Sequence, residues 1–161
     1  MHKRKFTAGF LMVAAVALAG SMSSTAAGAY TYALPVSACT SSAGSPIYPW
    51  QGIYNNSTTS IMNLDCNAAT VPESGGSVDA VAVNVDDQSS SSILCHMRLL
   101  NFSGDILHTA AQWSSSGTGE ATKTWDDLAT FGAPNSYVYC TIPVKSGSST
   151  SGVQSLWTQA T

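Results

Sequence analysis

An alternation of apolar and polar residues with a period of two recurs along most of the chain, and it predicts β-strands. In SVDAVAVNVDD, residues 77–87, every second residue from 81 to 85 is valine. This arrangement places a β-branched face opposite a smaller, more polar face, which is typical of a half-buried strand. The same alternation marks SIMNLDC (60–66), SILCHMRLL (92–100) and NSYVYCTIP (135–143). We therefore expect strands in these four segments.

The last three of these segments each include a cysteine on their more apolar face. Successive side chains of a strand point to opposite sides, so the sequence assigns each residue to a face. The apolar-face positions are Met62, Leu64, Cys66, Ile93, Cys95, Met97, Leu99, Val138, Cys140 and Ile142. The opposite-face positions are Ile61, Asn63, Asp65, Leu94, His96, Arg98, Leu100, Tyr137, Tyr139 and Thr141.

Gly, Ser, Asn and Pro separate further segments with strand character, and no segment after residue 30 shows an amphipathic helical stripe. Residues 101–105 are the best hairpin signal, and residues 124–131 fit one short helical turn. About eight strands separated by turns predict an all-β fold, an antiparallel β-sandwich of jelly-roll or immunoglobulin-like topology. The additional strand candidates are residues 34–40, 51–55, 105–114, 121–126 and 153–158.

The first 29 residues have the pattern of a secretory signal peptide. Three basic residues at positions 3–5 precede an apolar run at 10–19, and Ala27-Gly28-Ala29 offers small residues at a cleavage site. The apolar run is shorter than the roughly 20 residues that span a bilayer. We expect cleavage after residue 29, which leaves one secreted β-sandwich domain at residues 30–161.

The negative charge of that domain argues against anionic partners. Residues 1–29 contain three of the six Lys and Arg residues and none of the nine Asp and Glu residues. Residues 30–161 therefore have three cationic side chains against nine acidic ones, a formal charge of −6. Nucleic-acid binding depends on phosphate neutralisation, so nucleic acid is excluded as a partner, and electrostatic binding to anionic membranes is disfavoured.

Four cysteines in a small exported domain predict two disulfides. Four cysteines allow three pairings, and of these we favour Cys39–Cys66 with Cys95–Cys140. Each of these bonds would join segments that can lie side by side, and each half of the chain would have one bond. Cys95 is then unavailable as a thiol nucleophile or a metal ligand.

The sequence offers no convincing catalytic or metal-binding group. Cys95 and His96 point to opposite faces of one strand, so they cannot share a metal ion. His96 and His108 would have to meet across the hairpin, and we interpret both as surface histidines. The pairs Asp86-Asp87 and Asp126-Asp127 fit solvated turns better than a calcium site, and no G-x-S-x-G motif is present. We expect no enzyme activity, cofactor or metal ion.

Aromatic residues are the remaining candidates for a binding site. Tyr48, Trp50 and Tyr54 lie within seven residues of one another, and exposed rings often contact ligands in binding modules. The alternative is that the tyrosine and tryptophan rings fill the core of the sandwich. We keep Tyr48, Trp50 and Tyr54 as candidate ligand-binding residues.

Three segments together resemble a loose group of small secreted proteins of unassigned function from Gram-negative soil bacteria. They are a G-I-Y-N-x-S segment that leads to a cysteine strand (46–66), a V-x-D segment that leads to a second cysteine strand (82–99), and SYVYCTIP (136–143). The resemblance spans residues 38–157. It implies export, a β fold and two disulfides, and it implies no catalytic residue.

These observations predict a non-enzymatic protein that acts outside the cell or at its surface. Our main hypothesis is a structural or interaction protein of the cell surface or extracellular matrix, which binds itself or another surface protein. The alternative is a carbohydrate- or ligand-binding β-sandwich module, with a glycan as the partner. No membrane span is expected once the signal peptide is removed.

Overall fold

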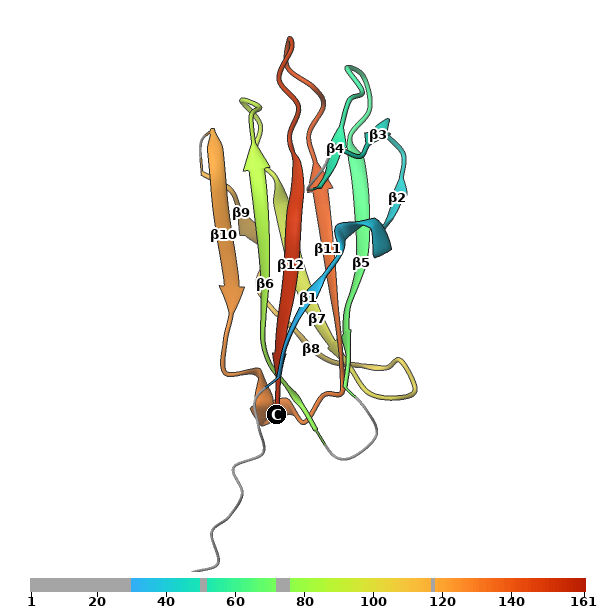
Figure 1. The fold of residues 1–161 in the computed structure, drawn as a ribbon, viewed down its shortest axis with the longest axis vertical. Helices are drawn as coiled ribbons and strands as arrows, with labels where there is room; N and C mark the ends of the chain where they lie inside the picture. The colour runs from blue at the N-terminus through green and yellow to red at the C-terminus, as the bar shows by residue number, and fades with distance from the viewer. Residues whose placement is uncertain (1–29, 50–51, 72–75, 117) are drawn as a thin grey trace, which may run out of the picture.

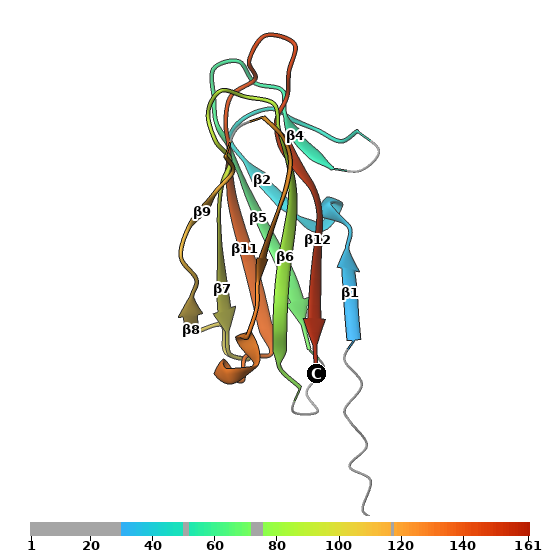
Figure 2. The same ribbon diagram turned by 90° about the vertical axis from the view of Figure 1, so that its left-hand side faces the viewer.

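The computed structural model describes residues 30–49, 52–71, 76–116 and 118–161. The expected signal peptide and Trp50 lie outside these residues. The described chain forms two antiparallel β-sheets that pack face to face, with long strands running along the molecule (Figure 1). A view from the side shows the two layers (Figure 2). No helix in the described ranges is long and apolar enough to cross a membrane.

The first sheet, sheet A, has six strands in the order β10-β6-β12-β4-β3, with β1 also paired to β12. The second, sheet B, has the order β2-β5-β11-β7-β8, with β9 also paired to β7. The strands of sheet A are β1 (Tyr30–Leu34), β3 (Pro46–Ile47), β4 (Ile53–Asn55), β6 (Val78–Asp87), β10 (Gly119–Trp125) and β12 (Gly152–Ala160). Those of sheet B are β2 (Thr40–Ser42), β5 (Met62–Thr70), β7 (Leu94–Leu100), β8 (Ile106–Thr109), β9 (Trp113–Ser114) and β11 (Asn135–Ile142).

The strand order distinguishes between the two sandwich topologies that the sequence left open. From β4 onward the chain alternates between the sheets, β4 to β5 to β6 to β7, then β10 to β11 to β12. Among the described residues from β4 onward, consecutive strands stay in one sheet from β7 to β8 and β9, in sheet B. This gives four-strand orders β4-β12-β6-β10 and β5-β11-β7-β8, which are those of a jelly roll. The prediction of an all-β antiparallel sandwich is confirmed, and its jelly-roll form is the observed one.

One predicted strand, residues 34–40, is not a strand. Pro35 follows β1, and a 3-10 helix, η1 (Val36–Ala38), turns the chain from sheet A to sheet B before β2 begins. Proline has no N–H to donate and fixes its own φ, so it ends β1. The short helical turn expected within 124–131 is present as η2 (Leu128–Phe131), and the predicted hairpin joins β7 to β8.

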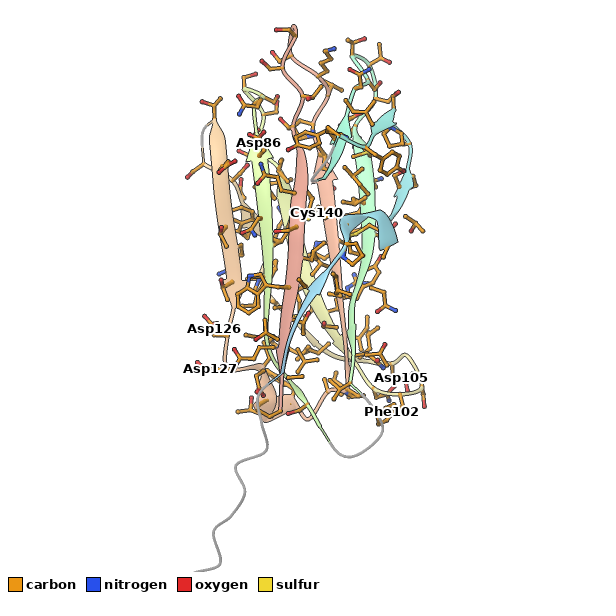
Figure 3. All side chains as sticks on the ribbon, viewed as in Figure 1. Asp86, Phe102, Asp105, Asp126, Asp127 and Cys140 are labelled. Atoms are coloured by element: carbon orange, nitrogen blue, oxygen red, sulfur yellow. A yellow bond between two sulfur atoms is a disulfide. The ribbon has the colours of Figure 1, made fainter. Side chains whose placement is uncertain are left out.

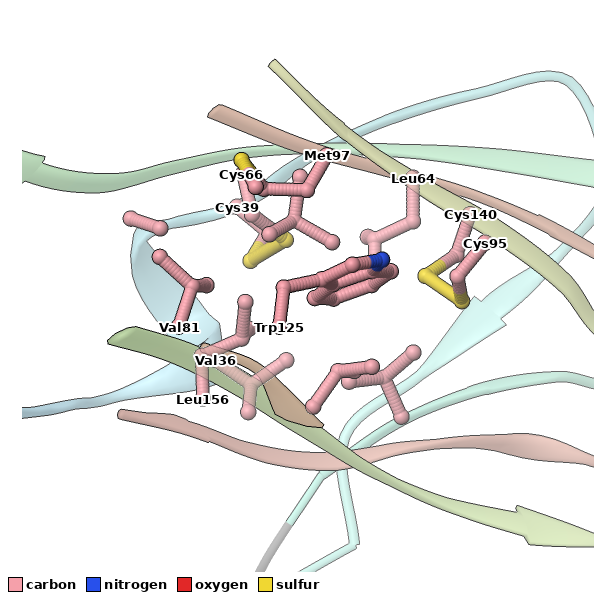
Figure 4. Packing of buried hydrophobic residues seen from close by; sticks show 14 of the residues in the cluster. Val36, Cys39, Leu64, Cys66, Val81, Cys95, Met97, Trp125, Cys140 and Leu156 are labelled. Atoms are coloured by element: carbon pink, nitrogen blue, oxygen red, sulfur yellow. A yellow bond between two sulfur atoms is a disulfide. The ribbon is translucent and has the colours of Figure 1, made fainter. Parts of the chain in front are cut away.

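The predicted apolar faces form the core. The side chains of Ile93, Cys95, Met97 and Leu99 are fully buried, as are those of Met62, Leu64, Val138 and Ile142. Trp125 also belongs to the core, as the core-filling interpretation of the tryptophans predicts for this residue. In the close-up its indole lies between the two disulfides (Figure 4).

Both favoured disulfides are present, Cys39–Cys66 and Cys95–Cys140. Cys95 and Cys140 face each other directly on the neighbouring strands β7 and β11, so their bond fixes the register of these strands. Cys39 ties the end of η1 to the middle of β5. By the loop-entropy estimate the bonds stabilise the fold by roughly 3.5 and 4 kcal/mol.

A buried carboxylate joins the loops at one end of the sandwich. Asp87 is 1% exposed, and its carboxylate accepts hydrogen bonds from the Oγ atoms of Ser115 and Ser151. The backbone N–H groups of Ser89 and Ile93 donate to the same carboxylate. Its neighbour Asp86 points to the other side of β6. The Asp86-Asp87 pair therefore does not converge on one site.

We expect Asp87→Asn to lower the free energy of unfolding by about 3 kcal/mol, because an amide nitrogen would face buried donors in place of an acceptor oxygen. Asp86→Asn is the matched control, since this side chain lies on the outer face, and its effect should stay within about 0.5 kcal/mol. Urea unfolding of both variants measures the difference. Equal stability of the two variants would contradict a structural role for the Asp87 carboxylate.

Candidate ligand-binding site

The outer face of sheet A, the side turned away from sheet B, presents three rows of side chains that cross the strands. The register defines each row, because directly paired residues of antiparallel strands lie on the same face. The first row is Tyr54, Gly152, Asp86 and Glu120; the second is Ser155, Asn84 and Thr122; the third is Trp157, Ala82 and Thr124. Asp86 marks the upper end of this face on β6 (Figure 3). An aromatic residue therefore stands in both the first row and the last.

Two glycines leave room for the ring of Tyr54. A β-carbon placed on Gly152 would lie 2.6 Å from Cγ and 2.7 Å from Cδ1 of Tyr54. One placed on Gly52 would lie 2.9 Å from Cε2 of the same ring. All three distances are far below van der Waals contact, so the ring packs across the backbone at the two glycines. Tyr54 itself is half-buried, and its ring is held close to the sheet.

The local sequence fixes β4 firmly beneath this ring. Ile53 is fully buried in the core, and the next residue but one, Asn55, is also fully buried. The Asn55 amide donates to the carbonyl oxygens of Ser60 at 2.9 Å and Pro143 at 3.0 Å. Its Oδ1 accepts from the backbone N–H of Ser57 at 3.0 Å. In the G-I-Y-N-x-S segment, Ile53 and Asn55 therefore anchor the strand, and the intervening Tyr54 points outward.

A chain of polar side chains extends from Tyr54 across the sheet. Gln154 hydrogen-bonds with the Tyr54 hydroxyl and donates from Nε2 to Oε1 of Glu120 at 3.1 Å. Burial raises the pKa of the Tyr54 hydroxyl, the hydrogen bond with Gln154 opposes this, and the carboxylates of Asp86 and Glu120 raise it further. Tyr54 therefore remains a neutral hydrogen-bonding group at physiological pH.

The second row is a similar polar chain. The Asn84 amide donates to Ser155 Oγ at 2.5 Å, and Thr122 Oγ1 donates to Asn84 Oδ1 at 2.6 Å. Side chains held by such hydrogen bonds lose little conformational freedom when a ligand binds. The middle of the face is thus a preordered band of hydroxyl and amide groups.

Trp157 ends this band. Its neighbours on β12, Leu156 and Thr158, are buried on the inner face, so Trp157 projects outward. Small residues flank it, with Ala82 opposite on β6 and Ala33 opposite on β1. The pairing partners of Gly152 and Trp157, Asp86 and Ala82, lie four residues apart on β6. At about 3.3 Å per residue, the two aromatic rows are ~13 Å apart.

Of the candidate residues from the sequence, the structure places Tyr54 in this site. Tyr48 is 61% exposed and directly follows β3, the strand beside β4. Trp50 lies outside the described residues, so the proposed cluster of three rings stays a prediction. The sequence reasoning missed Trp157, Gln154 and Glu120. Trp157 alternates with inward-facing residues in the predicted strand 153–158, and this alternation could have identified it as an outward aromatic residue.

The other chemical candidates do not converge. His96 stacks on Tyr139 with ring centroids 4.9 Å apart, and His108 stacks on Phe131 at 4.1 Å. Asp126 and Asp127 are both exposed. Across the described parts of the chain, no three His, Cys, Asp or Glu side chains come together as a possible metal site.

Comparisons with known proteins give only distant likenesses in structure. No protein-family model matches the sequence, and a search of curated protein sequences finds no match. The enzymatically active domain of tailspike protein 4 from bacteriophage CBA120 superposes with a TM-score of 0.48 at 10% identity, over 81% of this chain and 19% of the phage protein.

Two carbohydrate-binding modules are similar over nearly their whole length. The xylan-binding module CBM15 gives a TM-score of 0.47 at 14% identity, over 82% of this chain and 97% of the module. A family 35 carbohydrate-binding module from Clostridium thermocellum gives 0.43 at 11% identity, over 80% and 97%. At these TM-scores and identities, the likenesses assign no function to this chain.

The packing of Tyr54 on Gly152 predicts an energetic coupling between the two residues. Gly152→Ala should cost about 2–3 kcal/mol of stability, because the new methyl group overlaps the ring and the Ile53 carbonyl oxygen. In a Tyr54→Ala background the same change should cost at least about 1 kcal/mol less, since part of the overlap is gone. Chemical denaturation of the four proteins of this cycle gives the coupling. Equal costs in both backgrounds would show that the ring does not lie on Gly152.

Proposed function

We propose that this protein binds a neutral polysaccharide chain along the outer face of sheet A, outside the cell. The observation on which this rests is an outer sheet face with an aromatic residue in its first and last rows and a preordered polar band between them. Pyranose rings have apolar C–H faces and hydroxyl rims. The rings of Tyr54 and Trp157 would stack on the apolar faces of the sugars. The amide, hydroxyl and carboxylate groups between them would hydrogen-bond with the sugar hydroxyls.

The charge of the face favours a neutral ligand. Asp86 and Glu120 give it two carboxylates, which accept hydrogen bonds from hydroxyl groups and repel anions. The described residues include three cations, and each lies elsewhere: Lys123 stacks over Trp125 on the inner side of β10, Lys145 bonds Asn56, and Arg98 is in sheet B. A phosphate- or carboxylate-rich polymer would therefore find no counter-charge on this face.

The separation of the aromatic rows favours a chain over a single sugar. A spacing of ~13 Å along β12 exceeds the width of one pyranose ring, so one ligand must extend over several sugar units to contact both Tyr54 and Trp157. An open sheet face also admits the middle of a long chain, which a closed pocket does not. We infer that the physiological ligand is a polymer.

We infer that the protein binds the polysaccharide without hydrolysing it. Glycoside hydrolysis needs two carboxyl groups that flank one glycosidic bond. Asp86 and Glu120 are direct cross-strand neighbours on one face of the sheet, and each is engaged by an amide, from Gln88 at 2.5 Å and Gln154 at 3.1 Å. Both carboxylates thus lie on the same side of any chain that binds there.

Polysaccharide binding also fits the proposed location. The expected signal peptide and the two disulfides fit an oxidising compartment outside the cytoplasm. Of the two hypotheses from the sequence, this proposal takes up the alternative, a carbohydrate-binding β-sandwich module, and the main hypothesis of a structural or interaction protein stays a prediction. Pairing with a second protein chain is not needed for this role.

Titration calorimetry with neutral hexasaccharides, including xylohexaose and cellohexaose, tests the proposal. Tyr54→Ala and Trp157→Ala should each weaken binding about tenfold, which corresponds to about 1.4 kcal/mol. Tyr54→Phe should retain most of the affinity, because the ring stays and only the hydroxyl is lost.

Phe102→Ala is the matched control, because Phe102 is a 62% exposed ring in the loop at the far end of the molecule (Figure 3). It should bind like the unmodified protein. Failure of a broad panel of neutral oligosaccharides to bind the folded protein would refute the proposal. Release of new reducing ends during the titrations would show an enzyme in place of a binding module.

A further inference from the structure

The outer face of sheet B, the side opposite to the polysaccharide face, has a second cluster of outward side chains. Tyr139 on β11 lies directly between Asp65 on β5 and His96 on β7. In the next outward row, Tyr137 lies between Asn67 and Arg98. The three central strands of the sheet thus bring two tyrosines, an imidazole, a guanidinium and a carboxylate together on one face.

Most of this cluster is held in place by contacts within it. The Tyr137 hydroxyl donates a short hydrogen bond to Asp65. Burial and the bonded Asp65 carboxylate raise the pKa of Tyr137 to about 12, so the phenol stays neutral. His96 and Tyr139 lie nearly parallel, with 18° between their ring planes. Asp65 and His96 therefore already have partners within the cluster.

Arg98 differs from its neighbours because a buried donor of its guanidinium has no partner among the described residues. Its Nε is buried and has no hydrogen-bond acceptor among the described residues, although a guanidinium offers five N–H donors. Burial, with a smaller contribution from Arg98, lowers the pKa of His96, so the imidazole is neutral at pH 7. Arg98 is thus the cationic group of this cluster at neutral pH.

We propose that this cluster is a second binding site, which takes a sugar bearing a carboxylate, such as a uronate unit of an acidic polysaccharide. The planar guanidinium of Arg98 matches a carboxylate in charge and in fork geometry. Tyr137, Tyr139 and His96 lie on the same face as Arg98. Their rings and polar groups would contact the sugar ring and its hydroxyl groups. The site is independent of the neutral-polysaccharide site.

The charge balance of the protein restricts the ligand to one of low charge density. Residues 30–161 have a formal charge of −6, and a single arginine cannot compensate a densely sulfated or phosphorylated polymer. A ligand with one carboxylate per sugar places one anionic group on Arg98 and leaves its hydroxyls for the neighbouring side chains. With a site on each outer face, one molecule would join a neutral chain to an acidic one.

The experiment is a titration of the full-length mature protein with tri-galacturonate and, separately, with neutral galactotriose, monitored by NMR. Tri-galacturonate should shift the signals of Arg98, Tyr137 and Tyr139, and galactotriose should bind at least tenfold more weakly. Arg98→Gln should weaken tri-galacturonate binding at least tenfold, and Arg98→Lys should restore only part of it, because a lysine cannot form the bidentate contact. The affinity should fall as salt is raised.

Two controls separate this site from the rest of the protein. Lys145→Gln removes another cation and should leave tri-galacturonate binding unchanged, as should Tyr54→Ala on the opposite face. Binding of the neutral hexasaccharides by Arg98→Gln should also be unchanged, which shows that this variant is folded and that the two sites are separate. The proposal is wrong if tri-galacturonate does not bind at millimolar concentration, if Arg98→Gln binds it normally, or if Lys145→Gln loses it.

Discussion

The structure depends on the register between strands that each have one buried face. A shift of one residue between two paired strands would move every core side chain to solvent and every outer side chain to the core. The Cys95–Cys140 bond excludes such a shift between β7 and β11, because it joins directly opposed residues. On the outer side, the same register sets His96 beside Tyr139 and Arg98 beside Tyr137. A bond in the core thus positions the side chains of the surface.

In sheet A, buried polar groups hold the strands in register. Asp87 binds Ser151, the residue just before Gly152, and Asn55 anchors the segment just after Tyr54. These two buried side chains fix both strands that meet beneath the Tyr54 ring. Burial of a carboxylate and an amide is favourable only when their hydrogen bonds are satisfied, which both achieve. The loops at this end are therefore part of the support of the proposed polysaccharide site.

The two outer faces differ in charge although they belong to one small domain. Sheet A presents Asp86 and Glu120 with no cation of the described residues beside them, and sheet B presents Arg98 together with one carboxylate, Asp65, and neutral rings. A jelly roll is suited to this division, because its two sheets bury their inner faces against each other and leave both outer faces to solvent. The strand scaffold is common to both faces, and their chemistry is set by residues at outward positions that the core does not constrain.

The sequence by itself determined the long strands, the inner and outer phase of each, the presence of two disulfides and the acidity of the domain, because all of these follow from local alternation and composition. It also offered Tyr54 as a candidate ligand-binding residue. It failed at residues 34–40, where Pro35 ends one strand and η1 begins. Only the tertiary structure decided that the sandwich is a jelly roll and that Trp157 shares a face with Tyr54. It alone also set Arg98 beside Tyr137 and His96 beside Tyr139. These residues lie up to 103 positions apart, and their meeting depends on strand order and register, which arise from packing of the whole chain and have no local signature.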